Sequence, residues 1–164
     1  MLGEYEKVLD FQPETIPFMP NLALVMLGRS DEALRDLKRI DTGVATRLEF
    51  FTEGLRLLVE GTRAEALENV RRLTTIPDPE GRWYVARMMV YLGANDEALE
   101  LLGPVVEQGF FCLPAFTRDP WLDPIRGTPE FTAIVRRAEA RHRQALISFF
   151  NAEGDRILGV AHPV

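Results

Sequence analysis

Residues 28–34 read GRSDEAL, residues 61–67 read GTRAEAL and residues 93–99 read GANDEAL. All three stretches share the pattern Gly-x-x-x-Glu-Ala-Leu, and their glycines are 33 and 32 residues apart. A period of this length holds two helices of about three to four turns and two tight connections. The repeated stretch therefore predicts an all-helical chain built from stacked pairs of antiparallel helices.

Each copy of the pattern carries the local signals of a turn between two helices. Its glycine tolerates the left-handed conformation that ends a helix, and a second helix is expected to begin two positions later. The N-cap residues expected for these second helices are Ser30, Thr62 and Asn95. Thr62 together with Glu65 predicts a capping box. The small residues that allow the two helices to approach closely are Ala33, Ala66 and Ala98.

The repeat resembles the tetratricopeptide repeat (TPR) family, whose two-helix unit has glycine near its turn and a small residue five positions later. The resemblance covers roughly residues 1–108. It implies an all-α, right-handed α–α superhelix of about three helix pairs, plus a modified fourth pair with a long capping helix. Two departures from the family pattern stand out. The proline that closes each repeat in the family is replaced in register by Ala45, Asp78 and Phe110. The aromatic residue usually found early in the second helix is replaced by Ser30, Arg63 and Asn95. A related solenoid and a generic helical bundle therefore remain alternatives.

The period also sets the expected boundaries along the chain. Residues 1–13 are the second helix of an earlier repeat, and residues 14–41, 43–76 and 79–108 are the three pairs. Their helices are expected at residues 17–27 and 31–40, 44–60 and 63–73, and 82–92 and 96–107. Pro17 and Pro20 should shorten or kink the first of these, and Pro77 and Pro79 predict a helix-breaking connection over residues 75–81.

Residues 109–150 predict a modified repeat that ends in a capping helix. Asp119-Pro120 and Thr128-Pro129 each combine an N-cap residue with a proline suited to the first helical position, so each should start a helix. The apolar stripe expected along residues 129–150 is Phe131, Ile134, Val135, Ala138, Ala145, Leu146 and Phe149. Such a helix would close the open end of the array, and residues 151–164 should form a loosely held tail.

The stretch DPWLDPIRGTPEF at residues 119–131 carries a second resemblance. It is similar to the segment that closes TPR arrays in bacterial multidomain signalling proteins, notably Ser/Thr kinases, nucleotide cyclases and winged-helix regulators. The likeness implies a regulatory or scaffolding part of such a protein. No kinase or cyclase motif is present in the sequence.

Composition excludes several classes of function. The 164 residues carry 19 basic and 25 acidic side chains, a net charge of −6, which argues against binding to nucleic acid. A single cysteine excludes an internal disulfide and a multi-thiolate zinc site. The longest apolar run, residues 22–27, is far shorter than the roughly 20 residues that span a bilayer. Together with an acidic start that does not resemble a signal peptide, this predicts a cytoplasmic protein without membrane contact.

In the TPR family the first helices of the pairs line a concave surface, and the family spacing places apolar residues there. The expected inward residues are Phe18, Leu22, Met26, Leu48, Phe51, Leu55, Leu58, Trp83, Arg87 and Tyr91. Their functional interpretation is a groove for a peptide, an amphipathic helix or a second subunit, with Arg47, Glu80 and Arg87 at the rim. The alternative, favoured because helical apolar stripes are usually core, is that tight superhelical curvature, the C-terminal tail, a missing N-terminal repeat or a second subunit covers them.

Residues suited to catalysis or metal binding are few. Glu139 and His142 share a helix face, but one such pair without further ligands is a weak signal, and a structural histidine is expected. Cys112 is expected to be a small buried hydrophobe, and Asp119 is explained by capping. We therefore expect no catalytic residue, no metal and no cofactor. The expected function is a non-catalytic protein-interaction scaffold, and the alternative is a regulatory TPR segment of a larger signalling protein.

Overall fold

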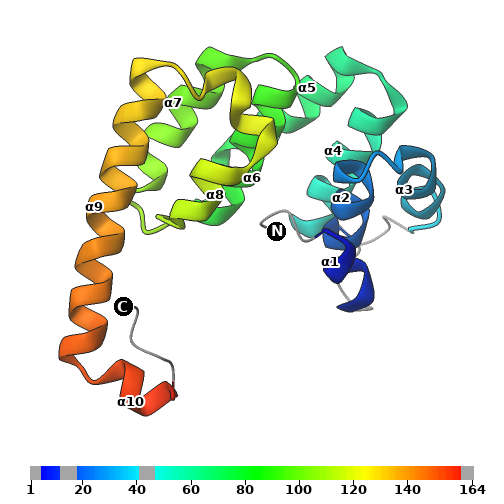
Figure 1. Cartoon of the computed structure of the whole chain (residues 1–164). Coiled ribbons are helices and arrows are strands. Elements are labelled where there is room, and N and C mark those ends of the chain that lie inside the picture. The colour runs from blue at the N-terminus through cyan, green and yellow to red at the C-terminus, as the bar shows by residue number, and fades with distance from the viewer. Residues whose placement is uncertain (1–4, 12–17, 41–46, 160–164) are drawn as a thin grey trace.

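The computed structural model describes residues 5–11, 18–40 and 47–159, without the side chains of residues 11 and 47–50. In those residues every regular element is a helix, which confirms the all-α prediction (Figure 1). The elements are α1 Tyr5–Phe11, α2 Phe18–Met26, α3 Ser30–Leu37, α4 Arg47–Glu60, α5 Arg63–Arg72, η1 Leu73–Thr75, α6 Pro79–Tyr91, α7 Asn95–Val105, α8 Leu113–Arg118, η2 Pro120–Ile125, α9 Pro129–Asn151 and α10 Gly154–Leu158.

The repeated glycines end helices as expected. Gly28, Gly61 and Gly93 have φ of +74°, +84° and +78°, a region in which only glycine avoids a steric penalty. At Gly93 the turn is closed by two bonds, from Gly93 N to Val90 O (2.9 Å) and from Ala94 N to Met89 O (2.9 Å). The three alanines that follow the turns are fully buried at the contact between paired helices; they are Ala33, Ala66 and Ala98.

The start of each second helix differs from the expectation. Ser30 and Asn95 are the first helical residues, so Arg29 and Ala94 occupy the N-cap positions. Thr62 is at the N-cap, but its side chain accepts no amide hydrogen, so the capping box with Glu65 is wrong. The reason is the backbone, because ψ at these N-caps is only 46–72° and not the extended value that turns a side chain toward the helix amides.

Side-chain caps occur where a proline follows the capping residue. Asp78, Asp119 and Thr128 have extended ψ of 117–146°, and their side chains accept from Gly81 N, Trp121 N and Phe131 N respectively. Asp78-Pro79 therefore starts α6 three residues before the expected residue 82. Asp119-Pro120 starts a 3₁₀ helix, η2, and the separate helix α8 was not expected before it.

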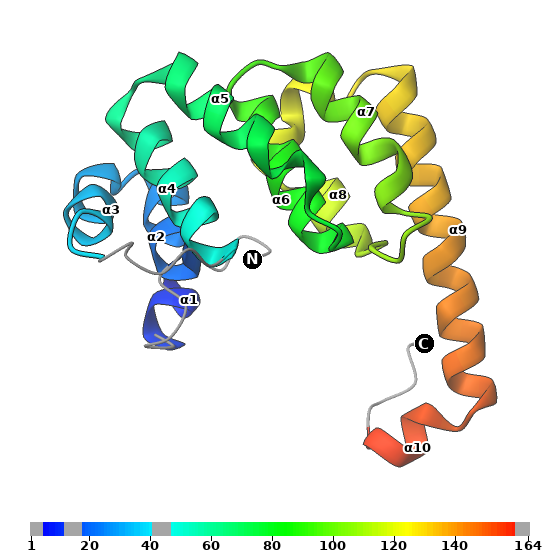
Figure 2. The same cartoon turned by 180° about the vertical axis from the view of Figure 1, so that it is seen from behind.

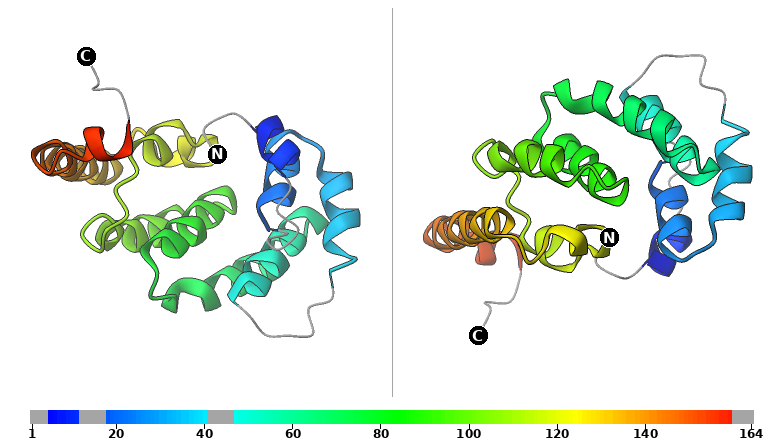
Figure 3. Two further views of the ribbon diagram at one scale, coloured as in Figure 1. Left: turned by 90° about the horizontal axis from the view of Figure 1, so that it is seen from below. Right: turned by 90° about the horizontal axis from the view of Figure 1, so that it is seen from above.

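The helix pairs follow one another around an arc. Viewed from below and from above, the chain winds around a common interior (Figure 3). α2 contacts α4, and α6 contacts η2, so the inner helices pack on one another along the arc. A contact between neighbouring pairs is made by Arg63 of α5, whose Nε donates to the carbonyl oxygen of Leu92 (2.9 Å) at the end of α6.

The capping helix α9 is buried along its first half only. Phe131, Ile134 and Ala138 are buried against the array, while the second half projects away from the body and leads into α10 (Figure 2). Farther along the expected stripe, Ala145 is exposed, and Leu146 and Phe149 are only half-buried. The expected stripe therefore meets the array only along its first half, because no other described helix of the array reaches its far end.

Candidate pocket on the inner face

One face of α6 gathers the polar and aromatic side chains of the interior. Glu80, Trp83, Tyr84 and Arg87 are spaced at i, i+3, i+4 and i+7, the spacing that places side chains on one side of a helix. The α7–α8 connection and α8 lie opposite and contribute apolar groups. Together they enclose a pocket of about 150 Å³ that is lined by Glu80, Trp83, Tyr84, Arg87, Phe110, Cys112, Pro114, Ala115 and Asp119.

A buried ion pair closes the inner end of this pocket. Arg87 Nε lies 2.6 Å from Asp119 Oδ2, and its Nη2 donates to Oδ1 at 3.2 Å. The two side chains are only 3% and 7% exposed, so their charges are desolvated and depend on each other. Asp119 Oδ1 also accepts from Trp121 N (2.9 Å), the capping bond of η2. The pair therefore ties α6 to η2 across 32 residues of sequence.

Aromatic rings surround the guanidinium of Arg87. Its Cζ lies 4.5 Å from the ring centroid of Trp121, 5.2 Å from that of Trp83 and 5.9 Å from that of Tyr84. These distances are within the range of cation–π attraction, which is stronger when the cation is desolvated. Met26 of α2 accepts a weak bond from Arg87 Nη2 (3.7 Å), so three segments of the chain meet at this residue.

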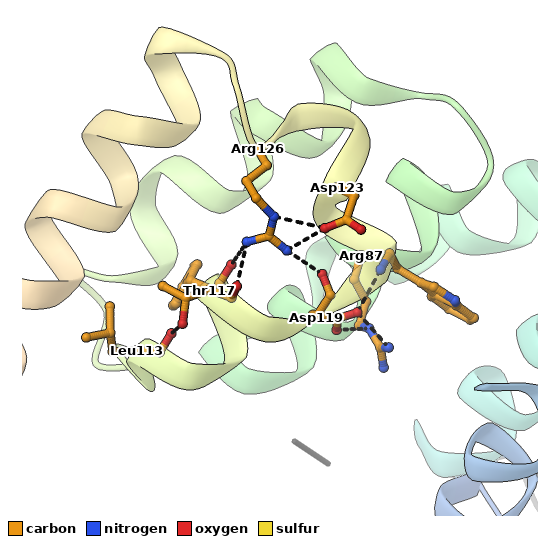
Figure 4. A network of polar contacts seen from close by, with 8 residues as sticks. Arg87, Leu113, Thr117, Asp119, Asp123 and Arg126 are labelled. Atoms are coloured by element: carbon orange, nitrogen blue, oxygen red, sulfur yellow. Dashed lines mark hydrogen bonds and ion pairs between the residues drawn. The ribbon is translucent and has the colours of Figure 1, made fainter. Parts of the chain in front are cut away.

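A second arginine fixes the backbone that carries Asp119. Arg126 donates from Nη1 to the carbonyl oxygens of Phe116 (3.1 Å) and Thr117 (2.7 Å), and from Nη2 to that of Asp119 (2.8 Å), as Figure 4 shows. Its charge is matched by Asp123 at 2.7 Å. Arg126 does not line the pocket, but it holds together the end of α8 and the start of η2, from which Asp119 projects.

Two tyrosines near the pocket, Tyr84 of α6 and Tyr5 of α1, have raised pKa values. Burial raises the pKa of the Tyr84 hydroxyl, and the negative charge of Glu80 raises it further while Arg87 opposes the change. Burial also raises the pKa of Tyr5, with the charge of Asp119 acting in the same direction and Arg87 against it. Tyr5 of the first helix therefore lies within electrostatic reach of the ion pair formed by α6 and η2.

The inward residues expected from the sequence are mostly buried inside the chain. Those less than a tenth exposed are Phe18, Leu22, Phe51, Leu55, Leu58, Trp83 and Arg87. Met26 is half-buried, Tyr91 is 46% exposed, and the side chain of Leu48, like that of Arg47, lies outside the described residues. Phe18 stacks with Phe51 (5.5 Å) and with Tyr84 (5.7 Å), so these residues pack on each other. This burial favours the alternative interpretation, in which the expected inward residues of α2 and α4 are part of the core and not an open groove.

Of the residues expected to face inward, Trp83 and Arg87 line the pocket. Glu80, which was expected at the rim of the groove, also lines it. Tyr84 was missed, although its spacing from Glu80 and Arg87 could have revealed it. Asp119 was expected only as a cap and also pairs with Arg87. Cys112 is exposed at the edge of the pocket, and the expectation that it is buried is wrong, because residues 110–112 form a connection and no helix covers it.

Other candidate groups lie apart from the pocket. Glu139 is exposed and His142 half-buried on α9. Within the described ranges, no three His, Cys, Asp or Glu side chains lie close enough together to hold a metal ion. None of the helices described is both long and apolar enough to cross a membrane. Comparison of the chain with protein-family models, curated proteins and solved structures gives no match.

Proposed function

We propose that the chain is a non-catalytic protein-interaction module, a TPR-like superhelix that holds a segment of a partner protein by binding one basic side chain in the α6–α8 pocket. Three in-register glycine turns with buried alanines support the TPR-like architecture. The pocket carries the functional part of the proposal, since it opens on the inner face where most other residues are already packed.

The charges that line the pocket favour a cation. Arg87 and Asp119 neutralise each other at 2.6 Å, which leaves the carboxylate of Glu80 as the unbalanced charge. Glu80 is exposed and makes no ion pair with any described residue. Trp83, Tyr84 and Phe110 add aromatic surface, which attracts cations through the negative faces of the rings. A lysine or arginine side chain satisfies both features, whereas an acidic side chain would be repelled by Glu80.

The size of the pocket favours a side chain over a cofactor. Its volume of about 150 Å³ is below the roughly 300–1,000 Å³ typical of pockets for drug-sized ligands. The rest of a partner segment would therefore lie across the rim. The commitment of Arg87 and Asp119 to each other supports a non-catalytic role, because their polar atoms already contact each other inside the chain.

Short peptides test this proposal. Acetylated, amidated pentapeptides Gly-Gly-X-Gly-Gly, with X as lysine, arginine, norleucine or glutamate, would be titrated into the protein while the indole NMR signals of Trp83 and Trp121 are followed. We expect the lysine and arginine peptides to shift the Trp83 signal and the other two to leave it unchanged. Glu80→Gln should weaken this binding by about two- to fivefold, the value of a partly exposed charge pair.

Glu100→Gln is the matched control, because Glu100 is also an exposed helical carboxylate without a described partner. It should bind the basic peptides like the parent protein. Equal binding of norleucine and lysine peptides, or an unchanged affinity in Glu80→Gln, would refute the basic side chain as the ligand.

A further inference from the structure

Two methionines of α2 contact the polar side chains of α6. Met19 Sδ accepts the hydroxyl hydrogen of Tyr84 (3.8 Å), and Met26 Sδ accepts from Arg87 Nη2 (3.7 Å). The two methionines are seven residues apart on α2 and their donors are three apart on α6, so each pair lies on one side of its helix. The arrangement of a thioether opposite a hydrogen-bond donor therefore occurs twice between the same two helices.

Both contacts leave the donor with a weak partner, because a thioether sulfur is a poor acceptor. The Tyr84 hydroxyl makes no other hydrogen bond with the residues that the structure describes. Burial raises the pKa of this hydroxyl, so it keeps the proton that it donates. Arg87 Nη2 carries two hydrogens and donates to Asp119 Oδ1 (3.2 Å) as well as to Met26. A stronger acceptor at either sulfur would therefore gain a hydrogen bond.

The same two methionines are the ones that a small oxidant can reach. Met19 and Met26 are half-buried, whereas Met88 and Met89 on α6 are each 1% exposed. Oxidation turns the apolar thioether into a polar sulfoxide, which disrupts packing where the surroundings are apolar. At these two positions the new oxygen would instead face the O–H of Tyr84 and the charged N–H of Arg87, and a bond to a charged donor is the stronger kind.

We propose that Met19 and Met26 form an oxidation site, at which a hydroperoxide converts both side chains to sulfoxides that bind Tyr84 and Arg87 and hold α2 more firmly against α6. In each step the sulfur lone pair attacks one oxygen of hydrogen peroxide, and the O–O bond breaks as the S–O bond forms. The hydroxide that is displaced takes the remaining proton from the new S–OH group and leaves as water, so the sulfur is oxidised and the peroxide reduced. Enzymatic reduction of the sulfoxide reverses the change. The proposal is independent of what the α6–α8 pocket binds.

Peroxide treatment of the folded full chain, followed by mass spectrometry of its peptides, tests the selectivity of the site. We expect Met19 and Met26 to gain one oxygen each at least about tenfold faster than Met88 and Met89, because the buried pair reacts only when the structure opens. Equal rates at all four methionines would overturn the proposal.

Urea denaturation measures what the sulfoxides do to the fold. Every protein compared carries Cys112→Ser, so that the exposed thiol does not react. Oxidation of Met19 and Met26 should lower the unfolding equilibrium constant by about three- to tenfold, the effect of one or two added hydrogen bonds. The control is the double variant Met19→Leu with Met26→Leu, which keeps apolar side chains of similar size and should be unchanged by peroxide. A loss of stability on oxidation would overturn the proposal.

Tyr84→Phe separates the new hydrogen bond from other effects of the added oxygen. In a Met26→Leu background only Met19 of the α2 pair reacts, and its sulfoxide should stabilise the chain by binding the Tyr84 hydroxyl. Addition of Tyr84→Phe keeps the aromatic ring and removes this donor, so peroxide should then give no gain in stability. The same gain with and without the hydroxyl would overturn the proposed pairing.

Discussion

The interior of the arc and the far end of α9 have similarly apolar sequences, LRLLV at residues 55–59 and ALISFF at residues 145–150, but they differ in burial. Leu55 is fully buried, whereas Ile147 is 61% exposed. The residues themselves do not account for this difference, because both stretches have helical periodicity. What differs is the number of helices that surround each one. α4 contacts α2 and, through Phe51 and Tyr84 (6.2 Å), α6. Among the helices that the structure describes, the far half of α9 has only α10 beside it (Figure 1). An apolar stripe therefore predicts a contact without telling which molecule provides it.

The largest effect is expected at the ion pair that distinguishes the interior from the surface. Asp119→Ala leaves Arg87 buried without a counter-charge, and it should lower the free energy of unfolding by about 3–5 kcal/mol. Glu97→Ala removes the partner of Arg71 in an exposed pair and should lower the free energy of unfolding far less, because water screens the charges of that pair. Urea denaturation measures both. If both variants lost the same free energy of unfolding, the burial of the Arg87–Asp119 pair would not be what makes the loss of Asp119 costly.

The double variant Arg87→Met with Asp119→Leu sharpens this result. It replaces both charges by apolar groups and should recover stability relative to Asp119→Ala, because no unpaired charge remains. A double variant no more stable than Asp119→Ala would show that the loss arises from the cap of η2 and not from the uncompensated arginine.

Truncation of one side chain in each apolar stretch tests the comparison itself. Leu55→Ala should lower the free energy of unfolding by about 2–5 kcal/mol, because it leaves a cavity between packed helices. Ile147→Ala should change it by no more than about 0.5 kcal/mol, as for most surface positions. Similar losses would show that the far half of α9 is packed in solution.

The smallest effect is expected from the two kinds of helix start. Thr128→Ala removes a side-chain cap of α9 and should cost about 1 kcal/mol, whereas Thr62→Ala removes no such bond and should stay within a few tenths. Thermal unfolding resolves this difference when the two variants are compared side by side. A larger loss of stability for Thr62→Ala would show that Thr62 does cap α5, as the capping-box prediction held.

The local part of the fold could be predicted because its causes are local. A positive φ at Gly28, Gly61 and Gly93 follows from glycine alone, and Thr128 caps α9 because the following proline keeps it extended. Thr62 has the same side chain but follows a glycine turn, whose backbone enters the helix without an extended residue. The capping box failed for that reason.

The centre of the candidate site could be predicted only in part. Trp83 and Arg87 follow from helical spacing, which is a property of one segment. The partner of Arg87 is Asp119, 32 residues away, and nothing in either local sequence indicates which carboxylate will meet the guanidinium. The pairing depends on how η2 packs on α6. That packing depends in turn on Arg126, which donates hydrogen bonds to the carbonyl oxygens of Phe116, Thr117 and Asp119.

The bond from Arg63 to the carbonyl of Leu92 affects how the array comes apart. The side chain belongs to the second pair, and the carbonyl it binds ends the first helix of the third. A Cβ on Gly93 would lie 2.7 Å from Arg63 Nη2, so the end of the Arg63 side chain would have to shift if another residue stood at this turn. If the second pair frays, the end of α6 loses a donor, and if the turn at Gly93 opens, Arg63 loses its acceptor. The two pairs are therefore coupled and should melt in one cooperative step, not one after the other.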